Sequence, residues 1–295
     1  MAHNNFYILE RLLRLLDDPR NDIYIHIDTK AGDFDENYFK RILKYSKLIY
    51  TQRTNVIWGD YSQINCELLL LKEATSNFKY DYYHLISGVD LPLKSQEEIH
   101  KFFDENQGKE FVHFTGLDLS QSTYNRASLY HLFSKYGRIR NIRSLRLVIV
   151  LMDHISLRLQ KIFKVDRLKN SNFKLAFGAN WFSITDNLAR YVIQQEDMIK
   201  KVFSKTTCAD ELFLQSLVYN SKFKKNLYYD KMDDNYIACL RYIDWHRKDC
   251  TSWPYVWRSK DFDELVSSSF LFARKFDCNI DKQIVDKIFD FVLKK

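Results

Sequence analysis

Glycine and proline are scarce in this sequence, and long apolar runs are missing. Only 7 glycines and 3 prolines occur in 295 residues, which disfavours collagen-like, linker-rich and turn-rich all-β architectures. The longest apolar run, Leu147–Met152, is far shorter than the roughly 20 residues that a membrane span needs. The first five residues carry neither a basic leader nor an apolar stretch, so we expect no secretory signal and a cytoplasmic protein.

The cysteines and the charges narrow the protein class further. Five widely spaced cysteines with no C-x-x-C pair predict reduced thiols rather than a disulfide framework. The net charge is +7, and the segment Arg138–Lys169 alone holds nine basic residues and two acids. A nucleic-acid binder would spread its basic surface more widely, so we expect a local anionic partner, either a substrate phosphate or a membrane surface.

Hydrophobic and aromatic residues are abundant, at 46% and 16% of the chain, and they follow alternating helix and strand patterns. Helical patterns cover residues 4–16, 38–45, 62–76, 97–106, 187–202, 210–219, 262–269 and 281–293. Strand patterns cover residues 22–28, 48–50, 80–87, 110–114, 178–184 and 235–244. This alternation predicts one α/β domain over residues 1–295, with a mainly parallel sheet, helices on both of its faces and a basic helical insertion at 138–169.

Several acids lie where an α/β sheet presents residues to ligands. Asp28 ends one predicted strand and Asp90 follows another, and the carboxyl ends of such strands meet nucleotides or sugars. An ordinary turn aspartate explains Asp28 equally well. Asp210 and Glu211 open a predicted helix, where a carboxylate is a candidate general base, although acids are also common in a first helical turn because they complement the helix dipole.

The familiar nucleotide, hydrolase and metal motifs are absent from this sequence. It has no phosphate loop, no G-x-G-x-x-G, no G-x-S-x-G and no H-E-x-x-H, and nothing in it demands a metal. A leaving diphosphate would then need side-chain cations. Arg274 and Lys275 lie inside an aromatic cluster and Arg241 in an apolar stretch, although a surface pair resting its stems on aromatic rings remains the alternative.

Six blocks of residues, in this order along the chain, resemble the core-2/I-branching β-1,6-N-acetylglucosaminyltransferase family, which includes peptide O-xylosyltransferases. The likeness runs from His3 to Asp277 and is greatest to the bacterial members. The blocks are His26–Lys30, Trp58–Ser62, Tyr82–Lys94, Gly178–Phe182, Ala209–Glu211 and Leu271–Asp277.

The resemblance implies a GT-A-type, Rossmann-like fold and an inverting transfer from a UDP-sugar without a metal or other cofactor. Glu211 matches the family's catalytic base. Lys275 matches the lysine that contacts the donor diphosphate, and Arg241 its second diphosphate contact. Asp28 matches the acid that contacts the uridine.

The same resemblance implies an acceptor side formed by Glu98, Asp90 and Trp181. We expect N-acetylglucosamine as the donor sugar, with xylose or another UDP-sugar as the alternative. The acceptor would be a glycan or a lipid-linked saccharide in bacterial surface polysaccharide synthesis, with no nucleic-acid partner. A catalytically inactive carbohydrate- or anion-binding relative is the alternative from another class, but the presence of both Glu211 and Lys275 argues against it.

Two parts of the chain differ from the family pattern. The family's first strand normally runs into the residues that match Met1–Asn4, so we expect that a short apolar strand added upstream would raise stability. The basic insertion lies outside the matching blocks. It is expected to contact anionic lipid at the inner face of the membrane, with Leu145, Leu147, Val148, Ile149 and Leu151 as its apolar side, or to be a packed helix pair with a solvated basic face.

Overall fold

The computed structural model describes residues 1–116, 118–133, 136, 143–169, 171–247 and 253–294. The strands are β1 (Asp22–Ile25), β2 (Lys47–Tyr50), β3 (Tyr82–His84), β4 (Leu91–Pro92), β5 (Phe111–Val112), β6 (Phe182–Thr185), β7 (Arg241–Ile243) and β8 (Phe272–Arg274). The α-helices are α1 (Phe6–Leu15), α2 (Glu36–Arg41), α3 (Ser62–Asn77), α4 (Gln96–Glu105), α5 (Gln121–Ser128), α7 (Arg143–Ile162), α8 (Asp186–Gln194), α9 (Glu196–Phe203), α10 (Phe213–Tyr219), α11 (Phe262–Ser267) and α12 (Lys282–Leu293). The short 3₁₀ helices are η1 (Thr29–Ala31), η2 (Ala209–Glu211), η3 (Lys222–Asn226), η4 (Tyr236–Ala238) and η5 (Ser259–Asp261).

The strands form three small sheets in the orders β1-β2, β3-β6-β5 and β4-β8-β7. β1 pairs with β2 and β7 with β8 in parallel, whereas β6 is antiparallel to both β3 and β5, and β4 is antiparallel to β8. The predicted α/β class is confirmed. The pairing is more mixed than the mainly parallel sheet that we expected, because alternation along a sequence gives the order of elements but not the direction in which β6 and β8 return to their partners.

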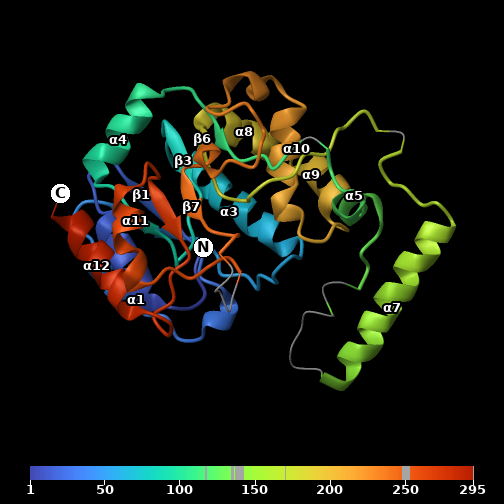
Figure 1. The fold of residues 1–295 in the computed structure, drawn as a ribbon, viewed down its shortest axis with the longest axis horizontal. Helices are drawn as coiled ribbons and strands as arrows, with labels where there is room; N and C mark the ends of the chain where they lie inside the picture. The colour runs from blue at the N-terminus through green and yellow to red at the C-terminus, as the bar shows by residue number, and fades with distance from the viewer. Residues whose placement is uncertain (117, 134–135, 137–142, 170, 248–252, 295) are drawn as a thin grey trace.

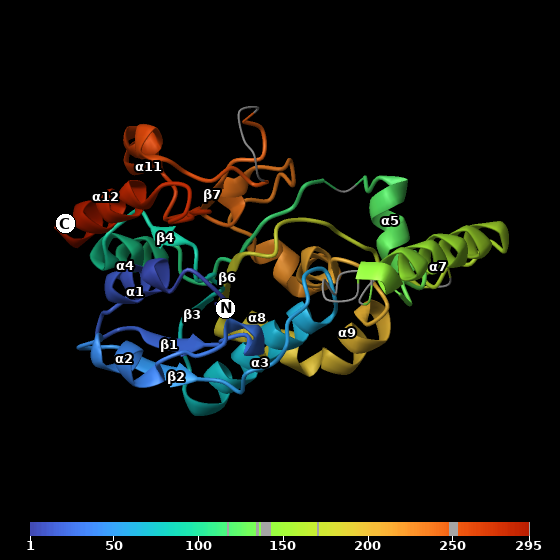
Figure 2. The same cartoon turned by 90° about the horizontal axis from the view of Figure 1, so that it is seen from below.

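Helices cover the strands on two sides. In Figures 1 and 2, α1, α11 and α12 lie to one side of β3 and β6, and α8, α9 and α10 lie to the other. α1 packs against α12, and α3 packs against α8.

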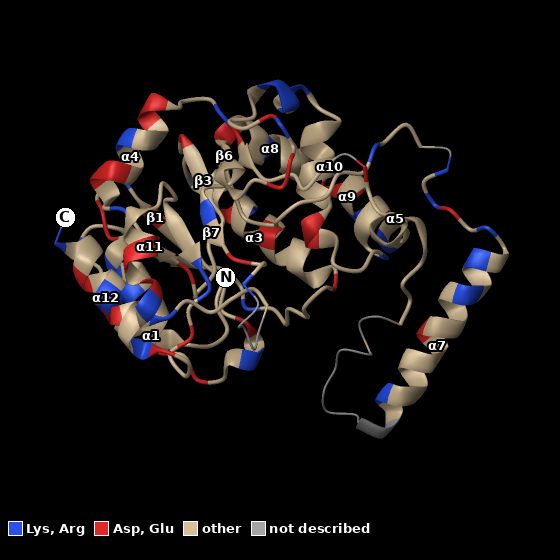
Figure 3. Ribbon diagram, viewed as in Figure 1, with Lys and Arg blue, Asp and Glu red and all other residues tan. Residues whose placement is uncertain are grey.

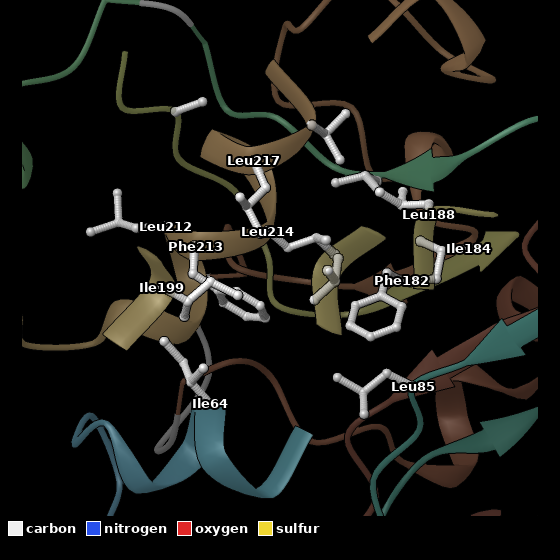
Figure 4. Close-up of a cluster of buried hydrophobic side chains, with 14 of the residues drawn as sticks. Ile64, Leu85, Phe182, Ile184, Leu188, Ile199, Leu212, Phe213, Leu214 and Leu217 are labelled. Atoms are coloured by element: carbon white, nitrogen blue, oxygen red, sulfur yellow. The ribbon is translucent and has the colours of Figure 1, made fainter. Parts of the chain in front are cut away.

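A large apolar core lies around β6 and α10, as Figure 4 shows. Phe182 and Ile184 of β6 and Phe213 and Leu217 of α10 are all buried and belong to this one apolar cluster. Burying a side chain of this size stabilises the fold by roughly 1.5–3 kcal/mol. Because α10 begins two residues after Glu211, this core fixes the position of the turn that carries the predicted base.

The basic insertion contains α7, which projects at the edge of the molecule on the side of α5 (Figures 1 and 2). Arg138 and Arg140 of the predicted insertion lie outside the described residues. No helix in the described ranges is long and apolar enough to cross a membrane. The cysteines in these ranges, Cys66, Cys208, Cys239 and Cys278, are free thiols, and Cys250 lies outside them.

The first two residues lie between the continuation of β1 and the loop after β3. The Ala2 amide donates to the His26 carbonyl at 2.9 Å, and the Gly88 amide donates to the Met1 carbonyl at 2.8 Å. Beside them is a cavity of about 430 Å³ that is lined by β1, β3, α1 and α3. Among the described strands, β1 and β3 each have a partner on one edge only.

Candidate active site

Glu211 lies in η2, and its carboxylate pairs with an arginine from a distant part of the chain. Arg126 of α5 places Nη2 2.6 Å from Glu211 Oε2. The same guanidinium donates to the carbonyls of Thr207 at 3.2 Å and Cys208 at 2.6 Å. The Glu211 side chain is 36% exposed, so the carboxylate is held in place and remains accessible to a substrate. The structure places Glu211 in a separate 3₁₀ turn rather than in the first turn of the helix that the sequence pattern predicted.

The residue before Glu211 ties this turn to two other parts of the chain. Asp210 is buried, and its Oδ2 accepts hydrogen bonds from Gln63 at 2.9 Å and Asn180 at 3.3 Å. The Gly178 amide donates to the Glu211 carbonyl at 3.0 Å. The matching blocks Gly178–Phe182 and Ala209–Glu211 therefore meet at the candidate base.

The segment that begins at Gly178 passes very close to the backbone just after β5. A Cβ atom on Gly178 would lie 2.0 Å from the His113 carbonyl oxygen, so only glycine fits there without a backbone shift. His113 Nδ1 accepts from the Ala179 amide at 3.0 Å. This packing fixes residues 178–181, and with them the direction in which Trp181 extends.

Trp181 and Asp90, two of the predicted acceptor residues, come together around an arginine. The Arg274 guanidinium lies 3.9 Å from the centroid of the Trp181 ring, and its Nη1 is 3.6 Å from Asp90 Oδ1. Asp90 also accepts from the Ser87 amide at 2.9 Å and the Ser87 hydroxyl at 2.6 Å. Burial lowers the pKa of Arg274, an effect that Asp90 opposes. The result is a fixed, partly desolvated cation.

Lys275, the predicted diphosphate contact, follows this arginine directly. Its Nζ donates to the Trp253 carbonyl at 3.4 Å. Burial and, after it, the neighbouring Arg274 charge lower the pKa of Lys275. Lys275 therefore comes just after the end of β8, directly after the arginine that rests on Trp181.

Tyr236 connects the acidic and cationic parts of the site. Its ring stacks on His113 at 4.2 Å between centroids. Burial is the main cause that raises the pKa of the Tyr236 hydroxyl, and the Glu211 carboxylate adds to it, whereas Tyr236 itself acts on the pKa of Arg274. The segment Gly178–Trp181 gives the geometric link: it begins at the Glu211 carbonyl, to which the Gly178 amide donates at 3.0 Å, and ends at the Trp181 ring, 3.9 Å from the Arg274 guanidinium. Glu211 and Arg274 therefore lie in one region of the molecule.

Sequence reasoning missed part of this site. Arg126 was not predicted, because an ion pair between residues far apart in the chain leaves no local pattern. Tyr236 was included in a predicted strand, but it lies in η4. Arg274 was a candidate diphosphate cation from its aromatic surroundings, but the resemblance assigned the two diphosphate contacts to Lys275 and Arg241.

The predicted uridine contact, Asp28, is 4% exposed and caps η1. Its Oδ1 accepts from the Lys30 amide at 2.8 Å and its Oδ2 from the Val56 amide at 3.1 Å. These bonds are those of a turn aspartate. A uridine contact by Asp28 stays a prediction.

Arg241 does not have the surroundings that a diphosphate contact needs. It is 1% exposed, and its two terminal nitrogens donate to Ser183 Oγ and to the carbonyls of Cys239, Leu85 and Phe182 at 2.6–3.2 Å. Burial lowers the pKa of Arg241 to about 10. Its donors join β7 to β3 and β6, so the structure does not support the predicted donor contact.

Glu98, a predicted acceptor contact, lies away from the candidate base. It belongs to the capping box of α4, where its Oε2 accepts from the Ser95 amide and the Ser95 hydroxyl, both at 2.8 Å. α4 lies far from α5 in both views (Figures 1 and 2). A capping role explains this glutamate, and the structure does not bring it to the candidate base.

Across the described ranges, no group of three or more His, Cys, Asp or Glu side chains could hold a metal ion. Metal independence stays a prediction.

The site brings an accessible carboxylate into the same region as an arginine that rests on a tryptophan. The family model of the Core-2/I-Branching enzyme matches residues 1–266. The chain belongs to this family of glycosyltransferases.

Curated relatives are similar over nearly the whole of this chain. Xylosyltransferase 2 of Rattus norvegicus is 24% identical over 306 residues, which cover 97% of this chain and 32% of the relative. Xylosyltransferase sqv-6 of Caenorhabditis briggsae is 24% identical over 304 residues, which cover 94% of this chain and 34% of the relative. The human xylosyltransferase 2 is 24% identical over 97% of this chain and 32% of its own length. The chain therefore spans about a third of the length of the relatives it matches.

Proposed function

We propose that this protein transfers a sugar from a UDP-sugar to a hydroxyl group of a glycan or lipid-linked saccharide, with inversion at the anomeric carbon and without a metal. The observation that carries the proposal is an Arg126-supported carboxylate, Glu211, in the same region as Arg274, which rests on Trp181 and is followed directly by Lys275. Inversion in one displacement needs one base and a stabilised leaving group, and these residues supply both.

Each residue has one role in the proposed step. The acceptor oxygen attacks the anomeric carbon while Glu211 takes the hydroxyl proton. The bond between that carbon and the diphosphate oxygen breaks, and its electron pair leaves with UDP. Lys275 and Arg274 stabilise the negative charge on UDP, so Arg274 takes the place that Arg241 had in the sequence-based assignment.

The remaining residues hold the reacting groups. Arg126 touches Glu211 rather than the substrate, so it is a positioning residue. Asp90 orients Arg274 through their 3.6 Å contact. Asp28, at the carboxyl end of β1, is proposed for the uridine, and Trp181 for the acceptor sugar.

The donor sugar is the less defined part of the proposal. N-acetylglucosamine remains the first candidate from the resemblance to the bacterial branching enzymes. Xylose is the second candidate, and the similarity to xylosyltransferases favours it. A bacterial surface polysaccharide precursor is the proposed acceptor.

The test is turnover of a panel of UDP-sugars in EDTA, with and without added Mn²⁺. The variants are Glu211→Gln and Lys275→Ala, and Glu98→Gln is the matched control because glutamine also completes a capping box. Glu211→Gln is expected to lose at least about 100-fold in kcat, as loss of a general base usually costs, while it still binds UDP. Lys275→Ala is expected to lose UDP affinity, and Glu98→Gln to keep both properties.

Three outcomes would overturn parts of the proposal. Unchanged turnover in Glu211→Gln would remove this residue as the base. Activity only with Mn²⁺ would remove metal independence. UDP binding without turnover of any donor, in the presence of saccharide acceptors, would favour the inactive relative.

A further inference from the structure

α7 turns a row of apolar side chains toward the solvent. The row, called here the outer row, consists of Leu147, Leu151, Ile155, Leu159 and Ile162. Its members recur every three or four residues, which places them on one face of the helix. Leu147 is 77% exposed and Ile162 is 71% exposed. Contiguous exposed apolar surface of this kind marks a site of interaction.

The opposite side of α7 mixes polar and apolar residues. Its half-buried residues are Val150, Asp153, Ser156, Leu157 and Gln160. Ile149, expected to be on the apolar contact side, is half-buried as well. Gln160 exchanges two hydrogen bonds with the backbone of Tyr130, at 2.7 and 3.0 Å. A helix that packs on its own core shows the reverse, with its apolar side inward. Packing within the described structure therefore does not explain the outer row.

The charges on α7 and just after it are basic and exposed. Arg146, Arg158, Lys161 and Lys164 are all exposed, and Asp153, on the half-buried side, is the one acid between residues 145 and 164. Figure 3 shows the Lys and Arg residues toward the two ends of α7 and the acid between them. The outer row is thus bordered by cations at both ends.

We propose that α7 docks on an anionic lipid bilayer, lying in the plane of the surface with the outer row in the acyl region and the cations at the headgroups. An interfacial helix combines a wide apolar face with basic residues in this way. A second copy of the chain fits less well, because pairing two α7 helices would bring like charges together. A nucleic acid would engage the cations but leave the outer row in water.

The docking surface is close to the candidate active site. The last turn of α7 and α5 line a cavity of about 390 Å³, with Lys161 and Lys164 on the α7 side. α5 also carries Arg126, the partner of Glu211. α7 would therefore lie between the bilayer and the helix that supports the candidate base. The docking proposal itself does not depend on the proposed reaction.

The test is co-sedimentation of the full chain with two kinds of vesicle: phosphatidylcholine alone, and phosphatidylcholine with phosphatidylglycerol at about two to one. We expect binding to the anionic vesicles only, and we expect it to weaken as salt rises. The double variant Arg158→Gln with Lys161→Gln is expected to bind about 25-fold more weakly, because each basic residue near a charged surface contributes about fivefold. The double variant Leu147→Glu with Leu151→Glu is expected to lose binding.

Matched controls separate docking from general effects of the substitutions. Leu293→Glu changes a leucine of α12 that is 61% exposed, and the double variant Lys40→Gln with Lys44→Gln removes two exposed cations near α2. Both controls are expected to bind like the wild type. Equal binding to neutral and anionic vesicles would overturn the proposal. Wild-type binding by the double variant Leu147→Glu with Leu151→Glu would also overturn it. A concentration-dependent dimer that those changes abolish would assign α7 to a second copy instead.

Discussion

An extended segment of about six apolar residues, joined ahead of Met1, is predicted to stabilise this fold by entering the cavity between β1 and β3. The cavity of about 430 Å³ has the open edges of these two strands at its sides. α1 contributes Leu9, Leu12 and Leu13 to one wall, and α3 contributes Leu70 and Leu71 to another. A strand in this place would have a helix on each face, which is the setting of a parallel strand inside an α/β sheet.

Two buried polar groups at the cavity also favour binding of an added strand there. The Met1 amino group is buried, which lowers its pKa, and it donates to the Ile86 carbonyl at 3.0 Å. Extending the chain would turn this amino group into an uncharged peptide N–H that keeps the bond. Glu67 is fully buried at the cavity, and neither of its oxygens has a hydrogen-bond partner among the described residues. Burial raises the pKa of Glu67 well above its usual value, and a new backbone N–H could satisfy it.

The expected gain is a few kcal/mol. Each apolar side chain that enters the cavity contributes roughly 2 kcal/mol, and each backbone hydrogen bond to β1 or β3 about 1 kcal/mol. Ordering the segment costs about 1.5 kcal/mol per residue. With three buried side chains and six hydrogen bonds the balance is a gain of about 3 kcal/mol, which for a chain of this size corresponds to a Tm rise of about 6 °C.

The measurement is thermal unfolding of the chain with three additions of equal length: the apolar segment, a Gly-Ser segment, and the apolar segment with two prolines. Only the first is expected to raise Tm, because Gly-Ser buries little surface and proline cannot donate to the neighbouring strand. Hydrogen exchange of the β1 and β3 amides should also slow in that variant alone. Equal Tm values for all three would show that the cavity does not accept a strand.

Three further predictions concern the site and the core. Gly178→Ala forces the backbone away from the His113 carbonyl, which a Cβ would approach to 2.0 Å. We expect this variant to lose about 1–3 kcal/mol of stability and roughly 100-fold in turnover. The control Gly108→Ala, at a positive φ but with open space around it, should lose some stability and keep its activity. Arg126→Ala is expected to lower kcat at least about tenfold without changing UDP affinity in calorimetry, because Arg126 contacts Glu211 and not the donor; a parallel loss of UDP affinity would contradict this positioning role. Burial raises the pKa of Glu110 from 4.5 to about 7, so the folded state holds this proton more tightly than the unfolded state. Stability should therefore fall as pH rises from about 4.5 to 7, by at most about 3 kcal/mol, and denaturant titrations of wild type and Glu110→Gln should differ by that slope if Glu110 is its source.

Much of the local structure could be predicted from the sequence. The predicted strand over 22–28 contains β1, the strand over 80–87 contains β3, and the amphipathic pattern over 281–293 coincides with α12. These elements follow from the spacing of apolar residues, which each segment carries by itself. The predicted strand over 235–244 divides into η4 and β7, because Leu240, with a φ of 61°, interrupts the extended chain.

Features that join distant segments could not be predicted in this way. The partner of Glu211 is 85 residues away, and the antiparallel return of β6 between β3 and β5 depends on packing of the whole chain. The resemblance to a known family supplied Glu211 and Lys275, but it did not show that Arg126 and Tyr236 complete their surroundings.

Arg241 and Arg274, the two arginines considered for the diphosphate, are both largely shielded from solvent but differ in how far protein acceptors already satisfy their guanidinium groups. Both Arg241 and Arg274 lie in apolar sequence contexts, and burial lowers the pKa of both. The two terminal nitrogens of Arg241 donate hydrogen bonds to four protein acceptors within 3.2 Å. A phosphate could bind Arg241 only by displacing these bonds. Arg274 rests on Trp181 with Asp90 at 3.6 Å, a longer contact that leaves its charge poorly satisfied. Because an under-satisfied, desolvated cation gains most from an incoming anion, Arg274 rather than Arg241 is the arginine to pair with Lys275.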